Sequence, residues 1–119
     1  MAIPSGPGTE VIKSTQIIAL TNSVQTLITG VANHIYTVLS IIVCEAGDQA
    51  GDQINIYLTD SNGSSNPAYI VRSQSVGVAE TFVFNDKFSY TGGTQKLQII
   101  VKTTGNMDVR CTYIDQDWS

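Results

Sequence analysis

The stretch that decides the fold is residues 35–45, Ile-Tyr-Thr-Val-Leu-Ser-Ile-Ile-Val-Cys-Glu. Its β-branched and aromatic residues favour a strand over a helix. With alternation of period two, one face carries Leu39, Ile41 and Val43, and the other carries Val38, Ile42 and Cys44. Because both faces are apolar, this strand is predicted to be covered on both sides, partly by a partner chain.

Shorter runs of alternating apolar and polar residues precede and follow this stretch, and turns rich in Gly, Asn, Ser and Pro separate them. No segment carries the apolar stripe of an amphipathic helix. The predicted strands cover residues 11–20, 24–28, 35–45, 54–59, 69–72, 81–84, 88–90, 97–101 and 109–113. Short strands at even spacing predict an all-β protein, an antiparallel β-sandwich or jelly roll of about eight strands.

The 119 residues suffice for one domain with its own core. Residues 1–10 contain Pro4 and Pro7 among glycines. Proline and glycine oppose both helices and central strands, so residues 1–10 are predicted to form an extended N-terminal arm. The β-sandwich domain is expected to cover residues 11–119.

Charged residues make up 13% of the chain, and Ser, Thr, Asn and Gln take their place. A surface poor in charge tolerates contact with a neighbour, because little charge must be desolvated there. The net charge is −4, and the six Lys and Arg residues stand singly along the chain. These features argue against nucleic acids and anionic membranes as partners. The N-terminus lacks the pattern of a secretory signal, so synthesis in a cytoplasm is expected.

Candidate catalytic groups are sparse. His34 is the single histidine, and no nucleophile-elbow motif accompanies it, so a structural or solvated role is expected. Asp48, Asp52 and Asp60 stand in predicted loops, where a carboxylate pair could serve glycoside hydrolysis or bind Ca²⁺. Aspartates are also ordinary turn formers, and this interpretation is preferred. The sequence therefore predicts no catalytic residue, no metal and no cofactor.

The two cysteines, Cys44 and Cys111, both fall within predicted strands. One interpretation makes them small buried hydrophobic residues. The other is a cross-strand contact, should the third and last strands pair. A zinc site is not expected, because two cysteines and a distant histidine cannot supply four ligands.

The aromatic residues could form a platform on which sugar rings stack, but most of them stand within strands and are expected in the core. They are Tyr36, Tyr57, Tyr69, Tyr90, Tyr113 and Trp118. Trp118 differs, because it follows the last predicted strand. It either folds back onto its own domain or anchors in a neighbouring chain, since tryptophan is frequent at the centres of interfaces.

The order of the strand segments resembles a known family. The segments concerned are residues 34–44, 54–58, 66–71, 81–84, 95–101 and 105–114. Together they are similar to small β-sandwich virion proteins of tailed bacteriophages, which include capsid decoration (cement) proteins and tail or neck accessory modules. The likeness covers roughly residues 21–115 and is a pattern of strands and turns, so no functional residue is carried over. It implies a sandwich or jelly roll, frequent trimers and no catalysis.

The resemblance and the composition together predict a structural virion protein. The expected role is that of a capsid decoration protein, which stabilises the head by binding across subunits of the major capsid protein on the capsid exterior. We expect a homo-oligomer, with a trimer favoured, and contacts through Ile3, Pro4, Pro7 and Trp118. The alternatives are a tail, neck or fibre module, and a carbohydrate-binding module for host recognition.

Overall fold

The computed structural model describes residues 9–47, 52–60, 65–103 and 106–118, and these ranges contain nine β-strands and no helix. The strands are β1 (Thr9–Leu20), β2 (Gln25–Thr29), β3 (His34–Glu45), β4 (Asp52–Asp60), β5 (Ser65–Val76), β6 (Thr81–Phe84), β7 (Phe88–Thr91), β8 (Lys96–Val101) and β9 (Met107–Asp117). The all-β prediction is confirmed. Within the same ranges, no helix is long and apolar enough to cross a membrane.

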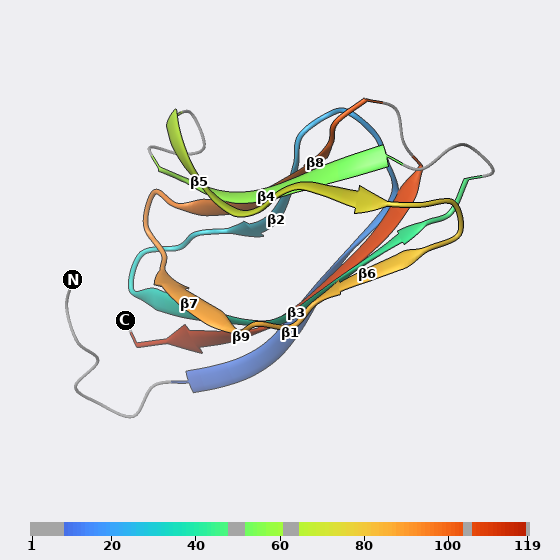
Figure 1. The fold of residues 1–119 in the computed structure, drawn as a ribbon. Helices are drawn as coiled ribbons and strands as arrows, with labels where there is room; N and C mark the ends of the chain where they lie inside the picture. The colour runs from blue at the N-terminus through green and yellow to red at the C-terminus, as the bar shows by residue number, and fades with distance from the viewer. Residues whose placement is uncertain (1–8, 48–51, 61–64, 104–105, 119) are drawn as a thin grey trace.

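The strands form two antiparallel sheets that lie face to face (Figure 1). Sheet A has the order β1-β9-β3-β6, with β7 also paired to β3, and sheet B has the order β2-β8-β4-β5. The chain crosses from one sheet to the other at nearly every connection; only β4–β5 and β6–β7 stay within a sheet. This alternation between two sheets is the topology of a jelly roll.

The core lies between the sheets, where alternate residues of each strand point inward. Strand β8 illustrates the pattern, since Leu97, Ile99 and Val101 are buried while the residues between them are half-buried. The buried apolar side chains are those of Leu20, Leu27, Ile28, Tyr36, Val38, Ile41, Val43, Ile54, Ile56, Val71, Val76, Tyr90, Leu97, Ile99, Val101, Met107, Val109 and Cys111. Removal of their apolar surface from water is the main force that holds the sheets together.

The predicted division of β3 into two faces is wrong in its first half. The register between β3 and β9 shifts between Val38 and Ser40, which marks a β-bulge at Leu39. The extra residue reverses the alternation, so that Val38 lies in the core with Ile41 and Val43 while Leu39 is only half-buried. Strict alternation could not predict this, because a bulge depends on the partner strand.

The outer edge of sheet A is interrupted opposite this bulge. Strand β7 pairs with the first part of β3, up to Val38, and β6 pairs with the second part, from Ile41 onward. Residues 85–87 separate β6 from β7. A bulged strand bends and twists more strongly, so one straight edge strand cannot follow β3 along its whole length.

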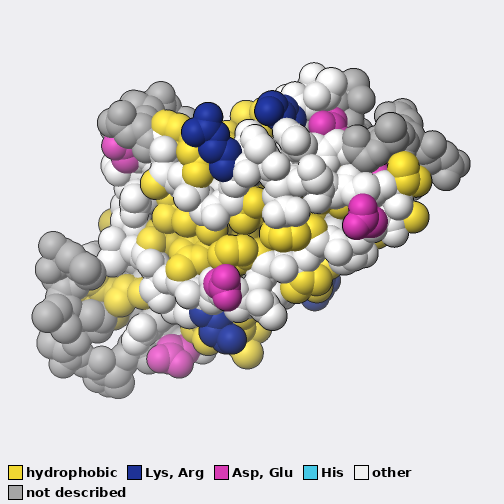
Figure 2. All heavy atoms as spheres, viewed as in Figure 1, with side chains coloured by type: hydrophobic (Ala, Val, Ile, Leu, Met, Phe, Trp, Pro, Cys, Tyr) yellow, Lys and Arg dark blue, Asp and Glu magenta, His cyan; other side chains and the backbone are white. Residues whose placement is uncertain are grey.

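The sandwich is less closed on the side where β5 and the β6–β7 edge lie. Figure 2 shows hydrophobic side chains gathered between the two sheets on this side. These three strands contribute four of the half-buried residues that pack against the core, namely Ile70, Phe82, Phe84 and Phe88. Because these strands are sheet edges, the core is only partly covered between them.

The predicted arm, residues 1–10, lies outside the described residues except for Thr9 and Glu10, which belong to β1. Thr9 pairs with Asp117, near the end of β9. The start of β1 therefore lies beside the end of β9, at one end of sheet A.

Two neighbouring isoleucines of β3 test the inward and outward faces of sheet A. Ile41 is fully buried, whereas Ile42 is 38% exposed. Ile41→Ala should lower the free energy of unfolding by about 3 kcal/mol, because it leaves a cavity between the sheets. Ile42→Ala should cost less than about 1 kcal/mol. Urea unfolding of both variants measures the difference, and equal losses would contradict the assignment of the two faces.

Candidate functional site

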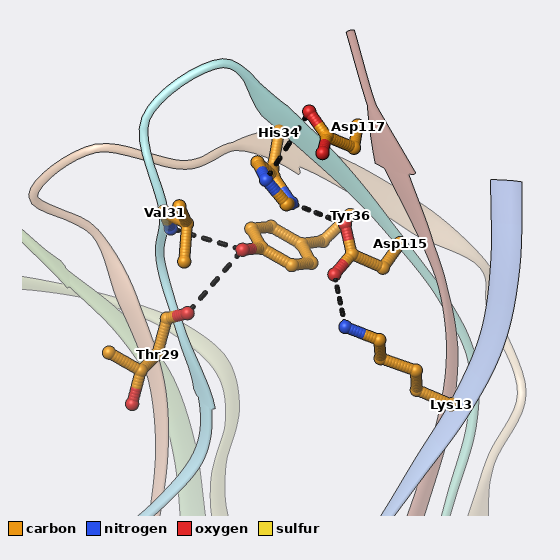
Figure 3. Close-up of polar contacts among 7 residues, drawn as sticks. All are labelled: Lys13, Thr29, Val31, His34, Tyr36, Asp115 and Asp117. Carbon is orange, nitrogen blue, oxygen red and sulfur yellow. Dashed lines mark hydrogen bonds and ion pairs between the residues drawn. The ribbon is translucent and has the colours of Figure 1, made fainter. Parts of the chain in front are cut away.

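A cluster of polar side chains joins three strands of sheet A at the end where β1 begins. Asp115 of β9 is buried, with 5% of its surface exposed. Its Oδ2 accepts a hydrogen bond from Nζ of Lys13 on β1 at 2.8 Å, and its Oδ1 lies 2.6 Å from Nδ1 of His34 on β3 (Figure 3). Oδ1 of Asp117 lies 3.5 Å from the other ring nitrogen of His34. The cluster thus ties an edge strand to the two strands beside it.

Tyr36 packs beside this cluster and reaches towards the turn before β3. Its hydroxyl accepts a hydrogen bond from the backbone N–H of Val31 at 3.0 Å and donates to the carbonyl of Thr29 at 3.5 Å. The backbone N–H of Gly92 donates to the carbonyl of His34 at 2.8 Å. A Cβ atom at Gly92 would collide with the backbone of Val31, so only glycine allows this close approach.

The pKa of the Asp115 carboxyl reflects two opposed effects. Burial acts to raise this pKa, but hydrogen bonds from Lys13 and His34 outweigh burial, and the pKa is lowered overall. The hydrogen bond to Asp115 in turn raises the pKa of Lys13. Asp115 is therefore charged at neutral pH and held by its partners, as a buried carboxylate must be.

The geometry of His34 fits the expected structural role. Both of its ring nitrogens face carboxylate oxygens, so neither is directed at a hydroxyl or thiol that could act as a nucleophile. Within the described residues, no group of three or more His, Cys, Asp or Glu side chains could hold a metal ion. That the chain is not an enzyme stays a prediction.

The loop carboxylates do not come together as a pair in the described part of the chain. Asp48 lies outside the described residues. Asp52 is the first residue of β4, where its Oδ1 accepts from the N–H of Gln53 at 2.7 Å and its Oδ2 accepts from the N–H of Thr103 at 3.1 Å. Asp60 stands at the far end of β4 from Asp52. Asp52 thus holds backbone N–H groups at the start of a strand, and its predicted place in a loop is wrong.

The two cysteines lie on strands that pair, but they do not meet. Cys111 is opposite Ile41 and Cys44 is opposite Asp108, and both thiols are free. Cys111 points into the core, where burial raises its pKa to about 12, whereas Cys44 lines the outer face of sheet A. The predicted contact between the two cysteines is therefore wrong. The predicted burial is confirmed for Cys111, whereas Cys44 is only half-buried.

The aromatic residues divide into two groups. Tyr36 and Tyr90 lie in the core, and Tyr113 packs against it. The ring centroids of Tyr90 and Tyr113 lie 5.3 and 6.1 Å from that of Tyr36. Tyr57 and Tyr69 form a separate pair on sheet B, with ring centroids 5.7 Å apart. The expectation of core tyrosines thus holds for the first group and fails for the second.

Trp118 is half-buried against its own domain. Its backbone N–H donates to the carbonyl of Asn33 at 3.1 Å. Its indole Nε1 is buried and has no hydrogen-bond partner among the described residues. The side chain thus packs on its own chain, and its contact with a neighbouring chain stays a prediction, as do contacts of Ile3, Pro4 and Pro7, which lie outside the described residues.

The outer face of sheet A carries an apolar surface, of which the sequence predicted only the part that Ile42 and Cys44 of β3 contribute. Ile18 is 70% exposed, Val83 is 52% exposed, and Val83 pairs directly with Ile42. Ile18 and Ile42 line a shallow hollow of about 300 Å³, whose other lining residues include Gln16 and Arg110. Further along this face, Ile12 is 70% exposed and lies opposite the half-buried Ile114. This apolar surface is a candidate for contact with a partner.

Three solved structures share this architecture at low sequence identity. A structure of Bacillus endospore appendages, described as disulfide-linked pili, gives a TM-score of 0.52 at 12% identity and covers 100% of this chain and 97% of that chain. A capsid structure of a Helicobacter pylori bacteriophage gives 0.52 at 7% identity, with 92% and 89% covered. A xylan-binding domain from Paenibacillus barcinonensis gives 0.51 at 12% identity, with 95% and 86% covered.

These similarities establish the shared fold. The chain matches no protein-family model and no curated protein. Jelly rolls serve many unrelated functions, so the role of this chain must be argued from its own surfaces.

The hydrogen bonds of Asp115 predict a pH-dependent stability. A carboxyl whose pKa is lowered by folding stabilises the fold at any pH above its pKa in the unfolded chain, which is about 3.9 for aspartate. This stabilisation is lost as the pH falls through the pKa in the folded chain. Asp115→Asn should therefore lower the free energy of unfolding by about 2 kcal/mol near neutral pH, and the deficit should shrink below about pH 4. Urea unfolding at a series of pH values measures this.

The exposed Asp86, between β6 and β7, provides the control. Asp86→Asn should follow the wild-type curve at every pH. A deficit of Asp115→Asn that stays constant from neutral to strongly acidic pH would show that the charge of Asp115 does not stabilise the fold.

Proposed function

We propose that this chain is a structural protein of a bacteriophage particle, most specifically a capsid decoration protein that binds across subunits of the major capsid protein. The observation that carries the proposal is the apolar outer face of sheet A, defined by Ile12, Ile18, Ile42 and Val83. A decoration protein must attach by surface burial alone, and such a face supplies apolar area at about 25 cal/mol per Å² removed from water.

Two charged residues of this face, Arg110 and Asp108, make hydrogen bonds within the chain. Arg110 donates to Oε1 of Gln16 at 3.2 Å and to Oγ of Ser14 at 3.4 Å. Oδ1 of Asp108 accepts from the N–H of Ala19 at 3.1 Å. A partner that covers the face therefore need not supply every hydrogen bond that water provides, which lowers the free-energy cost of burial.

The edges of sheet A support self-association. Strand β1 is a 12-residue edge strand, and β6 and β7 form the opposite edge. Unpaired backbone N–H and C=O groups at a sheet edge can pair with a strand of another chain. A homo-oligomer, with a trimer as the favoured form, would cover part of these edges and place several copies of the apolar face on one capsid.

The sign of the charge supports a place on the outside of the capsid. The net charge is −4, and packaged DNA would repel a protein of this charge on the inner surface. A tail, neck or fibre module is the alternative within the same class, and the position of the chain in a reconstruction of the particle separates the two.

The apolar face of sheet A predicts attachment to the shell. Val83→Asp should reduce co-sedimentation with undecorated capsid shells about tenfold or more, because it buries a charge in the contact. Val78, in the turn after β5, is 54% exposed and takes the same substitution without touching this face. Val78→Asp should load like the wild type. Equal loading of the two variants would remove the outer face of sheet A from the contact.

The N-terminal arm is the second predicted contact. Deletion of residues 1–10 should weaken attachment to shells or self-association, because it removes Ile3, Pro4 and Pro7. Light scattering reports self-association, and co-sedimentation reports attachment, with the midpoint of thermal unfolding as a check that the truncated chain folds. Wild-type loading and wild-type mass of the truncated protein would contradict a role of the arm.

A further inference from the structure

The outer face of sheet B carries an aromatic pair that the core does not use. Tyr57 of β4 and Tyr69 of β5 are direct cross-strand partners, and their ring planes are tilted by 58°. Ile56 and Leu58 on either side of Tyr57 pack in or against the core, so Tyr57 points away from it. Tyr69 is 44% exposed, although tyrosine rings usually bury much of their surface.

An arginine completes the aromatic group. The guanidinium carbon of Arg72 lies 4.8 Å from the centre of the Tyr69 ring, and both residues belong to the edge strand β5. Stacking of this kind holds the planar guanidinium over the ring. The guanidinium has five N–H groups at its rim, and these donate in the plane of the group. The surface therefore combines flat apolar rings with fixed hydrogen-bond donors.

Polar side chains extend the row across the sheet. Gln98 of β8 is the cross-strand partner of Tyr57, and Thr26 of β2 is the partner of Gln98. Nε2 of Gln98 donates to Oγ1 of Thr26 at 3.2 Å, and its second N–H is left for another acceptor. The row from Thr26 to Tyr69 spans four strands, about 14 Å at the usual strand spacing.

The chemistry of this row favours an uncharged or weakly acidic ligand with flat apolar patches and many hydroxyls. The strands of sheet B carry acidic residues only at the two ends of β4, Asp52 and Asp60, so the row itself is free of negative charge. Arg72 and Lys96, which lies two residues from Gln98 on the same side of β8, give too little positive charge to hold a phosphate backbone. A pyranose ring fits, because its C–H groups pack against the negative face of an aromatic ring and its hydroxyls bond to amide and guanidinium groups.

We propose that the outer face of sheet B binds a chain of pyranose sugars, which lies across the strands from Tyr69 to Gln98. Tyr57 and Tyr69 pack against the sugar rings, and Arg72 and Gln98 donate hydrogen bonds to ring substituents. This face lies on the opposite side of the sandwich from the apolar face of sheet A, as the two layers in Figure 1 show. One chain can therefore attach to a particle through sheet A and present sheet B to a glycan, and neither function depends on the other.

Isothermal titration of the full chain tests the proposal, with cellohexaose, xylohexaose and hexagalacturonic acid as probes. At least one probe should bind, and Tyr69→Ala and Tyr57→Ala should each weaken that binding about tenfold or more. Tyr69→Phe keeps the ring and should retain most of the affinity. If the natural ligand is acidic, Arg72→Gln should weaken the binding of hexagalacturonic acid more than the binding of the neutral probes. If the natural ligand is neutral, Arg72→Gln should weaken the binding of all bound probes equally.

Val83→Asp on sheet A is the matched control and should bind the probes like the wild type. The midpoint of thermal unfolding confirms that each variant is folded. Failure of the wild type to bind any of the three probes would overturn the proposal, and so would binding that the tyrosine changes leave intact. Tyr69→Ala should attach to capsid shells like the wild type. A failure of the glycan-binding proposal is therefore distinguishable from a failure of the proposed capsid role.

Discussion

The pairing of β3 with β9 in the middle of sheet A is the interaction on which the rest of the structure depends. These two strands pair from His34 opposite Asp117 to Glu45 opposite Met107, and every other strand of sheet A attaches to one of them. A central strand must present its apolar residues to the core along its whole length. The bulge at Leu39 meets this constraint by turning both Val38 and Ile41 inward. It also divides the neighbouring edge into β6 and β7.

The edge strand β1 depends on this pair through both its backbone and a buried charge. Its ladder to β9 runs from Thr9 to Ile17 without a register shift, and Lys13 in the middle of it reaches the carboxylate of Asp115. A buried carboxylate is costly unless it is paired, so this contact favours one register of β1 against all others. The same carboxylate holds His34 at the start of β3. The polar cluster is thus best understood as a device for strand registration, although its residue types resemble those of a catalytic site.

The two outer faces of the sandwich differ in chemistry. The face of sheet A is apolar, and its Arg110 and Asp108 make hydrogen bonds within the chain, which suits a contact with another protein. The face of sheet B carries tyrosines, an arginine and an amide in one row, which suits a ligand rich in hydroxyls. The separation follows from the jelly roll, because alternate residues of each strand serve the core and leave one independent surface on each side.

Much of the architecture could be predicted from the sequence, because alternation of apolar residues and the positions of turn residues are local properties. The strands, the all-β class, the inward position of Cys111 and the structural role of His34 belong to this part. The site chemistry could be predicted only in part: the sequence offered His34 and the tyrosines, but not their partners. His34 meets Asp115 only because two strands 81 positions apart are paired.

Tertiary structure alone decided three features. The bulge at Leu39 depends on the strand opposite it, and it overrode the local alternation. The separation of Tyr57 and Tyr69 from the core tyrosines depends on which side of each strand faces the other sheet. The apolar face of sheet A gathers Ile18, Ile42 and Val83 from three strands. The sequence by itself thus determined where strands form, and tertiary structure determined which faces they share, because register and sheet order are properties of pairs of distant segments.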